Sequence, residues 1–116
     1  MNDVRITAGG AMEDESSRRF EEAWRRAERG ETFHERHLAF ESWEALARIL
    51  SGKRMELLRY VRRHNVTSVR ALAKALSRDY SNVHADVQAL ANAGLLDSAN
   101  GALRADYDAI ETRIAI

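Results

Sequence analysis

The stretch from Ser68 to Leu96 constrains the fold of this chain more than any other segment. It runs SVRALAKALSRDYSNVHADVQALANAGLL and holds two helical patterns separated by the polar break SRDY. In the first pattern the apolar residues recur at helical spacing, and the leading serine is a natural N-cap. In the second, Val83, Val87 and Leu90 share one face, and Gly94 is the expected terminator. The stretch therefore predicts two packed helices joined by a tight turn.

The second helix, predicted from about Tyr80 to Ala93, has an outer face of short or amide side chains. A helix that is merely solvated carries Glu and Lys on its outer face, and this one does not. Side chains of this kind allow close approach to another surface. The residues of the bare face are Ser81, His84, Ala85, Gln88 and Asn92.

The flanking segments extend this pair into a longer pattern. KRMELLRYVRRHN, before it, is predicted to be a helix with Leu57, Leu58 and Val61 inward. After it, Asn100-Gly101 is the favoured pair for a type I′ hairpin turn. Helix, short helix, tight turn, helix and hairpin form the order of a winged helix-turn-helix. We therefore expect a mainly α fold with a small β component, with this domain at 51–109, a recognition helix at 80–93 and a wing at 95–107.

Positive charge is concentrated between Gly52 and Arg78, although the formal net charge of the whole chain is zero. Eight Lys and Arg residues stand in this segment against a single acid, Glu56. Because a local cluster of bases attracts a polyanion even when the overall charge is balanced, the segment is a candidate anion-binding surface. Arg70, Lys74 and Arg78 are the expected phosphate contacts around the turn.

The predicted DNA interface combines these bases with the bare helix face and the hairpin. Asn and Gln can pair with adenine through two hydrogen bonds, and an exposed alanine can contact a thymine methyl group. The predicted DNA-binding residues are Arg70, Lys74, Arg78, Tyr80, Ser81, Asn82, His84, Ala85, Gln88, Asn100 and Arg104.

The remaining segments flank this domain. Residues 1–12 are polar and aperiodic, so we expect a disordered arm that can be trimmed. Residues 13–50 predict a helix at 14–29, a strand at 32–40 and a helix capped by Ser42, which together serve packing or dimerisation. Residues 110–116 alternate strictly and predict a C-terminal strand that needs a partner strand.

Composition excludes several classes of function. The chain has no cysteine, which rules out disulfides and thiolate metal sites, and His34 and His37 have the wrong spacing for a zinc protease motif. Neither a G-x-S-x-G elbow nor a glycine-rich phosphate loop accompanies His84. Without a signal peptide or an apolar run of membrane-spanning length, we expect a cytoplasmic protein that does not enter a membrane. We predict no enzyme, no metal and no cofactor.

These segments also resemble a known family. The stretch from Ser68 to Leu96 resembles MarR-like winged-helix regulators, closest to a group of small predicted transcriptional regulators, some of which are encoded beside toxin genes. FESWEALARILSGKRMELLRYV and YDAIETRIAI look like the flanking segments of that group. The resemblance implies DNA binding, autoregulation and dimerisation. It places Arg78, Tyr80, Ser81, Asn82 and His84 at the leading end of the recognition helix.

One departure from that group bears on affinity. Similar proteins often carry a base where Ala85 or Gln88 stands here, and Asp86 adds a negative charge to the helix. The wing has only Arg104 as a base. We expect weaker DNA binding than in those proteins. MarR-like proteins often bind small aromatic molecules, but Phe20 and Trp24 lie at helical spacing, which is more typical of a packing stripe, so no effector is assigned.

The predicted function is that of a sequence-specific regulator of double-stranded DNA, a repressor that can regulate its own gene. The alternative is an antitoxin-type interaction module whose acidic N-terminal part neutralises a toxin partner. We also predict a homodimer built on the terminal strand, paired with the strand at 32–40 either within one chain or by exchange between two. The residues expected to take part in this pairing are Leu38, Phe40, Ile110, Ile114 and Ile116.

Overall fold

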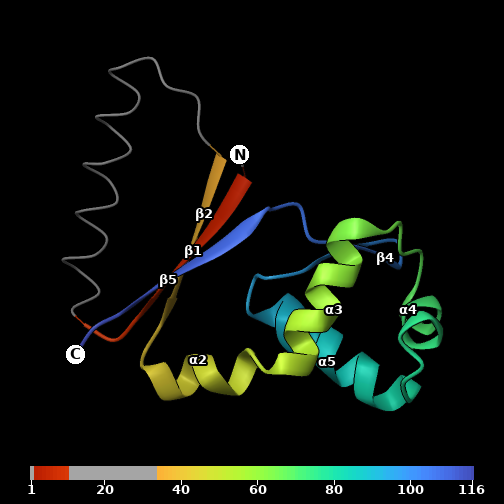
Figure 1. Cartoon of the computed structure of the whole chain (residues 1–116), viewed down its shortest axis with the longest axis horizontal. Coiled ribbons are helices and arrows are strands. Elements are labelled where there is room, and N and C mark those ends of the chain that lie inside the picture. Colours follow the sequence, from red (N-terminus) through yellow and green to blue (C-terminus); the bar gives the residue numbers. More distant parts are fainter. Residues whose placement is uncertain (1, 11–33) are drawn as a thin grey trace. The chain divides into compact units, whose positions relative to one another are not determined.

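The computed structural model describes residues 2–10 and 34–116 (Figure 1). The chain divides into two compact units, which are described separately below. The sheet unit comprises Met1–Leu46 and Tyr107–Ile116, and the helical unit comprises Ala47–Asp106. The helix predicted at 14–29 lies outside the described residues. None of the helices in the described ranges is long and apolar enough to cross a membrane.

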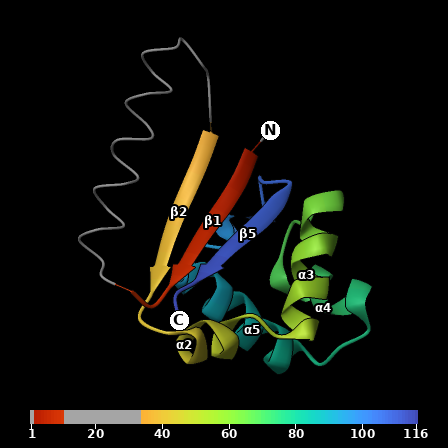
Figure 2. The ribbon, with the colours of Figure 1, turned by 60° about the vertical axis from the view of Figure 1, so that its left-hand side comes forward.

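The sheet unit is built on three parallel strands, β1 (Asn2–Ala8), β2 (His34–Phe40) and β5 (Ala109–Ile114), in the order β2-β1-β5 (Figure 2). β1 pairs with β2 from Asn2↔His34 to Ala8↔Phe40, and with β5 from Asp3↔Ala109 to Ala8↔Ile114. One face of β1 is fully buried, because Val4, Ile6 and Ala8 alternate with polar residues along the strand. The core of this unit therefore lies along its central strand.

Strand β1 corrects the prediction of a disordered arm at residues 1–12, since residues 2–8 of that segment form a strand. Residues 2–8 form the central strand of the sheet. β2 and β5 each pair with this strand and with no other strand of the sheet. The segment is polar in composition and two glycines follow it, but Val4, Ile6 and Ala8 alternate with polar residues at the period of a strand. Gly9 and Gly10 end the strand with φ of +78° and +79°, values that suit glycine.

The C-terminal strand is confirmed at Ala109–Ile114, but within one chain it does not pair with the strand expected at 32–40. β5 pairs with β1, and β2 pairs with the opposite edge of β1, so β2 and β5 do not meet. When residues 2–8 are taken as disordered, the sequence offers the two outer strands no partner strand other than each other. The fold is accordingly mixed α/β rather than mainly α, with four helices, a parallel three-stranded sheet and a hairpin among the described residues.

Local sequence signals set the helix boundaries. α2 (Trp43–Ile49) begins after Ser42, whose Oγ accepts a hydrogen bond from the Ala45 N–H at 3.2 Å. α3 (Gly52–Arg63) is capped in the same way by Ser51, and α4 (Val69–Leu76) by Ser68. α5 (Tyr80–Asn92) is capped by Asp79. The helix ranges predicted from Ser42 to Ala93 are confirmed to within a few residues.

The helical unit buries one face of each helix. α3 buries Leu57, Leu58 and Val61, as its apolar spacing predicts. α4 contributes Leu72 and Ala73 to the same core. From α5 come Val83, Val87 and Leu90. A hairpin of β3 (Asp97–Ala99) and β4 (Ala102–Arg104) completes the unit.

Backbone conformation fixes the connections between these elements. Asn100 and Gly101 both have positive φ, at 53° and 84°, which is the requirement of a type I′ turn and confirms the predicted hairpin. Ser77 ends α4 in the left-handed region, and the Arg78 N–H bonds back to the Ala73 carbonyl. The edge of β4 is extended by a bridge between Val66 and Leu103. These links hold α3, α4, α5 and the hairpin in one compact unit.

Candidate nucleic-acid interface

The outer face of α5 is exposed along its length, as its sequence predicts. Every member of the bare face is exposed, and so is Asn82 beside it. The opposite face packs into the core of the helical unit. Because no Lys, Arg or Glu side chain projects from this exposed face, it offers hydroxyl, imidazole and amide groups at close range. The exposed residues of the face are Ser81, His84, Ala85, Gln88 and Asn92.

A stacked group of side chains joins α4 to α5. The Arg70 guanidinium carbon lies 4.9 Å from the centre of the Tyr80 ring, and the Tyr80 and His84 rings lie 5.8 Å apart at a tilt of 34°. A cation over an aromatic face is attracted to it, so Tyr80 restrains Arg70 at the edge of the bare face. Arg70 and Lys74 are both exposed. The structure therefore places Arg70 beside the predicted base-reading helix, and Lys74 is exposed one turn further along α4.

The third predicted phosphate contact, Arg78, has a partner inside the unit. Its Nη2 donates to Asp86 Oδ2 at 2.8 Å, and Arg54 Nε donates to Asp86 Oδ1 at 3.0 Å. The side chains of this ion triad are only 14–19% exposed. The structure thus assigns Arg78 to the fixing of the turn between α4 and α5, where its other η nitrogen is buried with no hydrogen-bond partner among the described residues.

Asp86 is therefore not an open negative charge on the helix. Burial raises the pKa of its carboxyl, but the hydrogen bonds and positive charges of Arg78 and Arg54 outweigh burial and bring the pKa below its ordinary value. Arg54 also donates through Nη1 to the Arg48 and Ile49 carbonyls, at 2.9 and 3.0 Å. The triad consequently joins the end of α2, the start of α3 and the turn to the middle of α5. Sequence reasoning missed it because Arg54 and Asp86 stand 32 positions apart.

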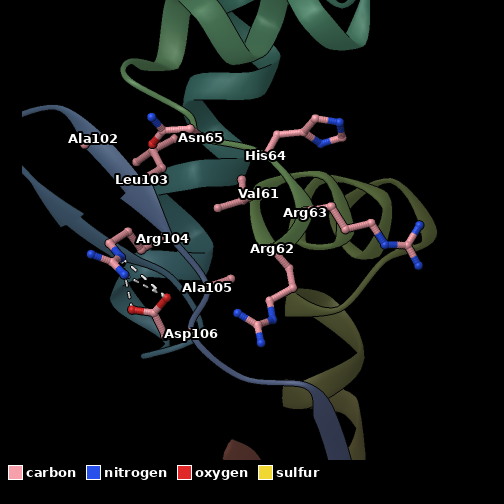
Figure 3. Close-up of a pocket in the computed structure, with 10 residues that line it drawn as sticks. All are labelled: Val61, Arg62, Arg63, His64, Asn65, Ala102, Leu103, Arg104, Ala105 and Asp106. Atoms are coloured by element: carbon pink, nitrogen blue, oxygen red, sulfur yellow. Dashed lines mark hydrogen bonds and ion pairs between the residues drawn. The ribbon is translucent and has the colours of Figure 1, made fainter.

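A basic hollow of about 430 Å³ lies between the end of α3 and β4 (Figure 3). Arg62, Arg63 and Arg104 are among its lining residues, and Asp106 is the acid. Arg104 Nε lies 3.1 Å from an Asp106 oxygen, and both side chains are well exposed. Figure 3 shows Arg63 extending from α3 away from β4. Sequence reasoning identified the basic segment but not this hollow, since the chain returns to it only after the hairpin.

The hairpin residues expected to meet DNA lie at and beside its turn. Asn100 is exposed in the turn, and Arg104 is exposed at the end of β4, where it pairs with Asp106. The structure thus brings Arg70, Tyr80 and His84 together and leaves Arg104 partly neutralised. Among the described residues, no three His, Asp or Glu side chains come together as a metal site would need.

The residues expected to mediate dimerisation are in the sheet unit. Leu38 and Phe40 are half-buried on β2, next to Ile6 and Ala8 of the central strand. Ile110 is half-buried on β5, whereas Ile114 and Ile116 are exposed. A second hollow, of about 450 Å³, lies where the three strands end and is lined by Trp43, Ile114 and Ile116 among others.

Comparison with known proteins gives one match. Neither the curated proteins nor the solved structures provide a chain similar to this one. A family model does match residues 49–112, which is more than half of the chain and contains α3, α4, α5, the hairpin and most of β5. The chain therefore belongs to the HVO_A0114 family.

Proposed function

We propose that the helical unit is a winged helix-turn-helix that binds double-stranded DNA and acts as a transcriptional regulator, a repressor able to act on its own gene. Its elements occur in the order α3, the Val66 bridge, α4, α5 and the β3–β4 hairpin, which is compatible with that fold. In the proposal, α5 enters the major groove and the hairpin is the wing. The resemblance to MarR-like regulators points in the same direction.

One observation carries the proposal: the exposed face of α5 is free of acid, and α4, which packs on α5, carries two exposed bases. Asp86, the acidic residue within α5, is held by Arg54 and Arg78 and does not stand against a phosphate backbone. Arg70 and Lys74 supply positive charge on the α4 side. A solvated packing helix has no need of this arrangement, whereas a helix in the major groove does.

The antitoxin-type alternative depends on the acidic segment before Gly30, which lies outside the described residues. No observation in the described part of the chain favours a protein partner over DNA at the α4–α5 surface. DNA binding is therefore the function that we propose for the helical unit.

Binding to duplex DNA should fall steeply with salt. A fluorescently labelled duplex from the promoter of the gene, titrated at several salt concentrations, should give log affinity linear in log salt, with a slope of about 0.9 per phosphate neutralised. Log affinity should fall by about two or more per tenfold rise in salt, since in the proposal at least Arg70 and Lys74 contact phosphate. No binding to any duplex at low salt would remove the proposal.

Substitutions on the two sides of the interface should have different effects. Gln88→Ala or Asn82→Ala should relax preference among sequences, by about 1–3 kcal/mol at the base pair contacted, because amide side chains read base edges. Arg70→Ala or Lys74→Ala should weaken binding to all duplexes alike and reduce the salt slope by about one phosphate each.

A matched control is Arg59→Ala. Arg59 is exposed on the side of α3 opposite Leu57 and Val61, so its loss removes the same charge away from the proposed interface. Competition between a selected site and scrambled duplexes measures both effects. If all four interface variants weakened every duplex by one common factor, α5 would not be the reading helix.

A further inference from the structure

Strand β5 forms an edge of the sheet as the structure describes it, and its outward backbone groups can be identified. The Ala115 N–H donates to the Ala8 carbonyl at 2.9 Å, so the odd-numbered residues of β5 direct their backbone groups toward β1. Backbone groups alternate in direction along a strand. The N–H and C=O of Ile110, Thr112 and Ile114 therefore point outward, and such an edge is a template for another strand.

The sequence along this edge is self-complementary. Residues 109–115 run A-I-E-T-R-I-A, which is the same in both directions except that Glu111 and Arg113 exchange charge. In an antiparallel pair centred on Thr112, each Ile110 lies opposite Ile114 of the other copy. Each Glu111 likewise lies opposite an Arg113. A two-fold dimer requires this property, because one surface must fit a second copy of itself.

We propose that two copies of this chain pair through β5 in antiparallel orientation, with Thr112 on the two-fold axis, and so form a continuous six-stranded sheet. The outward groups of Ile110, Thr112 and Ile114 then pair in ladder geometry with the same groups of the second copy. This inference concerns the sheet unit and does not depend on the proposed DNA binding.

Charge selects this register over its neighbours. In the nearest alternative registers the outward backbone groups of the two strands still face each other. These registers are centred on Glu111 or on Arg113. The first places Glu111 against Glu111 of the second copy, and the other places Arg113 against Arg113. Like charges directly opposite each other destabilise a strand pair, whereas opposite charges stabilise it. Pairing centred on Thr112 is the arrangement among the three in which charges of opposite sign face each other.

On both faces of the proposed six-stranded sheet, the side chains at the junction match those of the three-stranded sheet. Ile110 and Ile114 lie beside Val4 and Ala8 in register, so the two isoleucines of each cross-strand pair extend the apolar face of β1. On the other face Glu111 lies 3.4 Å from Arg5 of β1. Arg113 of the second copy would join the opposite side of Glu111, completing a row of alternating charge across the new junction.

In the proposed dimer β5 pairs with β5 of the second copy, and not with the strand expected at 32–40. The outer edge of β2 remains the competing surface for a second copy. The Gly9 N–H donates to the Phe40 carbonyl at 3.1 Å, so even-numbered residues of β2 direct their backbone groups toward β1 and the Ala39 N–H points outward. The two edges can therefore be blocked separately, by equivalent substitutions.

Proline at each edge tests which one pairs. Thr112→Pro removes an outward N–H and leaves the β1–β5 ladder intact, so it should weaken the dimer by about a hundredfold without unfolding the sheet. Ala39→Pro is the matched control on β2 and should leave the dimer unchanged. Mass in solution across protein concentration measures dimerisation, and circular dichroism checks the fold of each full-length variant.

Charge exchange tests the register. Arg113→Glu places an acid opposite Glu111 of the other copy, and the two-fold symmetry repeats this like-charge pair. The substitution should therefore weaken the dimer roughly tenfold. The double variant Glu111→Arg with Arg113→Glu restores opposite charges across the junction and should recover the dimer, even though it loses the contact with Arg5. Recovery would distinguish a cross-strand pair from a general loss of solubility or fold.

Three results would overturn the proposal. They are a wild-type chain that stays monomeric up to about 1 mM, a dimer that Ala39→Pro disrupts while Thr112→Pro does not, and a charge-exchanged double variant no better than Arg113→Glu. Because mass is measured without DNA, failure here leaves the proposed DNA binding standing, and failure of DNA binding leaves the dimer standing.

Discussion

Replacing Ile6 with alanine should lower the free energy of unfolding of the sheet unit by about 2–5 kcal/mol. Ile6 is completely buried at the middle of β1, between Leu38 on β2 and Thr112 on β5. Truncation removes apolar surface from the core and leaves a cavity that neighbouring strands cannot fill without breaking their hydrogen bonds to β1. Both outer strands should loosen together.

Hydrogen exchange read by mass spectrometry would locate the effect. Peptides from β1, β2 and β5 of the Ile6→Ala variant should exchange faster, and peptides from α3 and α5 should keep their protection. Thr7→Ala is the matched control, because Thr7 is half-buried on the other face of the same strand. Urea unfolding should separate the two variants clearly. Equal stability would mean that β1 is not the core strand of the unit.

A chain without residues 1–10 extends the same test. β2 and β5 pair with β1 and not with each other, so both ladders disappear when β1 is removed. The sequence predicted that this segment could be trimmed without consequence. Retention of the exchange protection of β2 and β5 in the shortened chain would support that earlier expectation and contradict the topology.

Elements set by local signals were predictable. Helix starts at Ser42 and Ser68 follow from side chains that accept hydrogen bonds from N–H groups three residues later. The hairpin follows from Asn100 and Gly101, which adopt the positive φ that a type I′ turn demands. In each case the residues that decide the conformation are neighbours in the chain. The sequence alone therefore gives α3, α4, α5 and the hairpin nearly in full.

The parallel sheet was not predictable in the same way. Val4, Ile6 and Ala8 show the alternation of a strand, but the segment is short and two glycines follow it. Its partners lie at 34–40 and 109–114, far along the chain. Parallel strands need a long crossover connection, so no turn sequence marks their pairing. Burial in the folded unit decides which strand lies in the centre of the sheet. The residue pattern of one strand does not show how deeply that strand will be buried.

The candidate interface likewise has features that the sequence predicts and features that it does not. Helical periodicity alone places Gln88 and Ala85 on the outer face of α5, and the structure confirms that they are exposed. The neutralisation of Asp86 could not be predicted, because one of its two partners, Arg54, comes from another helix. From the sequence Asp86 is a charge that opposes DNA, whereas in the structure it holds the turn before the helix.

Asp86→Ala should lower the free energy of unfolding of the helical unit by about 1.5–3 kcal/mol, the range for hydrogen bonds to charged groups. The substitution leaves the Arg54 and Arg78 guanidinium groups close together, largely shielded from water, with no carboxylate between them. Asp106→Ala is the control, since it breaks another Asp–Arg pair whose side chains are well exposed. That change should cost less than about 1 kcal/mol. Equal losses in the two variants would show that the triad contributes no more than a surface ion pair.

The pH dependence of the same difference provides an independent check. Because the pKa of Asp86 is lower in the folded chain, the unfolded chain binds the proton more readily. The triad therefore contributes stability that is fully present above the unfolded pKa of about 3.8. This contribution falls as pH drops through the folded value. Urea unfolding of the wild type and of Asp86→Asn should therefore differ by a constant amount near neutral pH and converge below about pH 4. Other carboxyls titrate in both proteins and cancel in the difference. A gap that stayed constant to the lowest pH would show that the charge on Asp86 does not hold the two arginines.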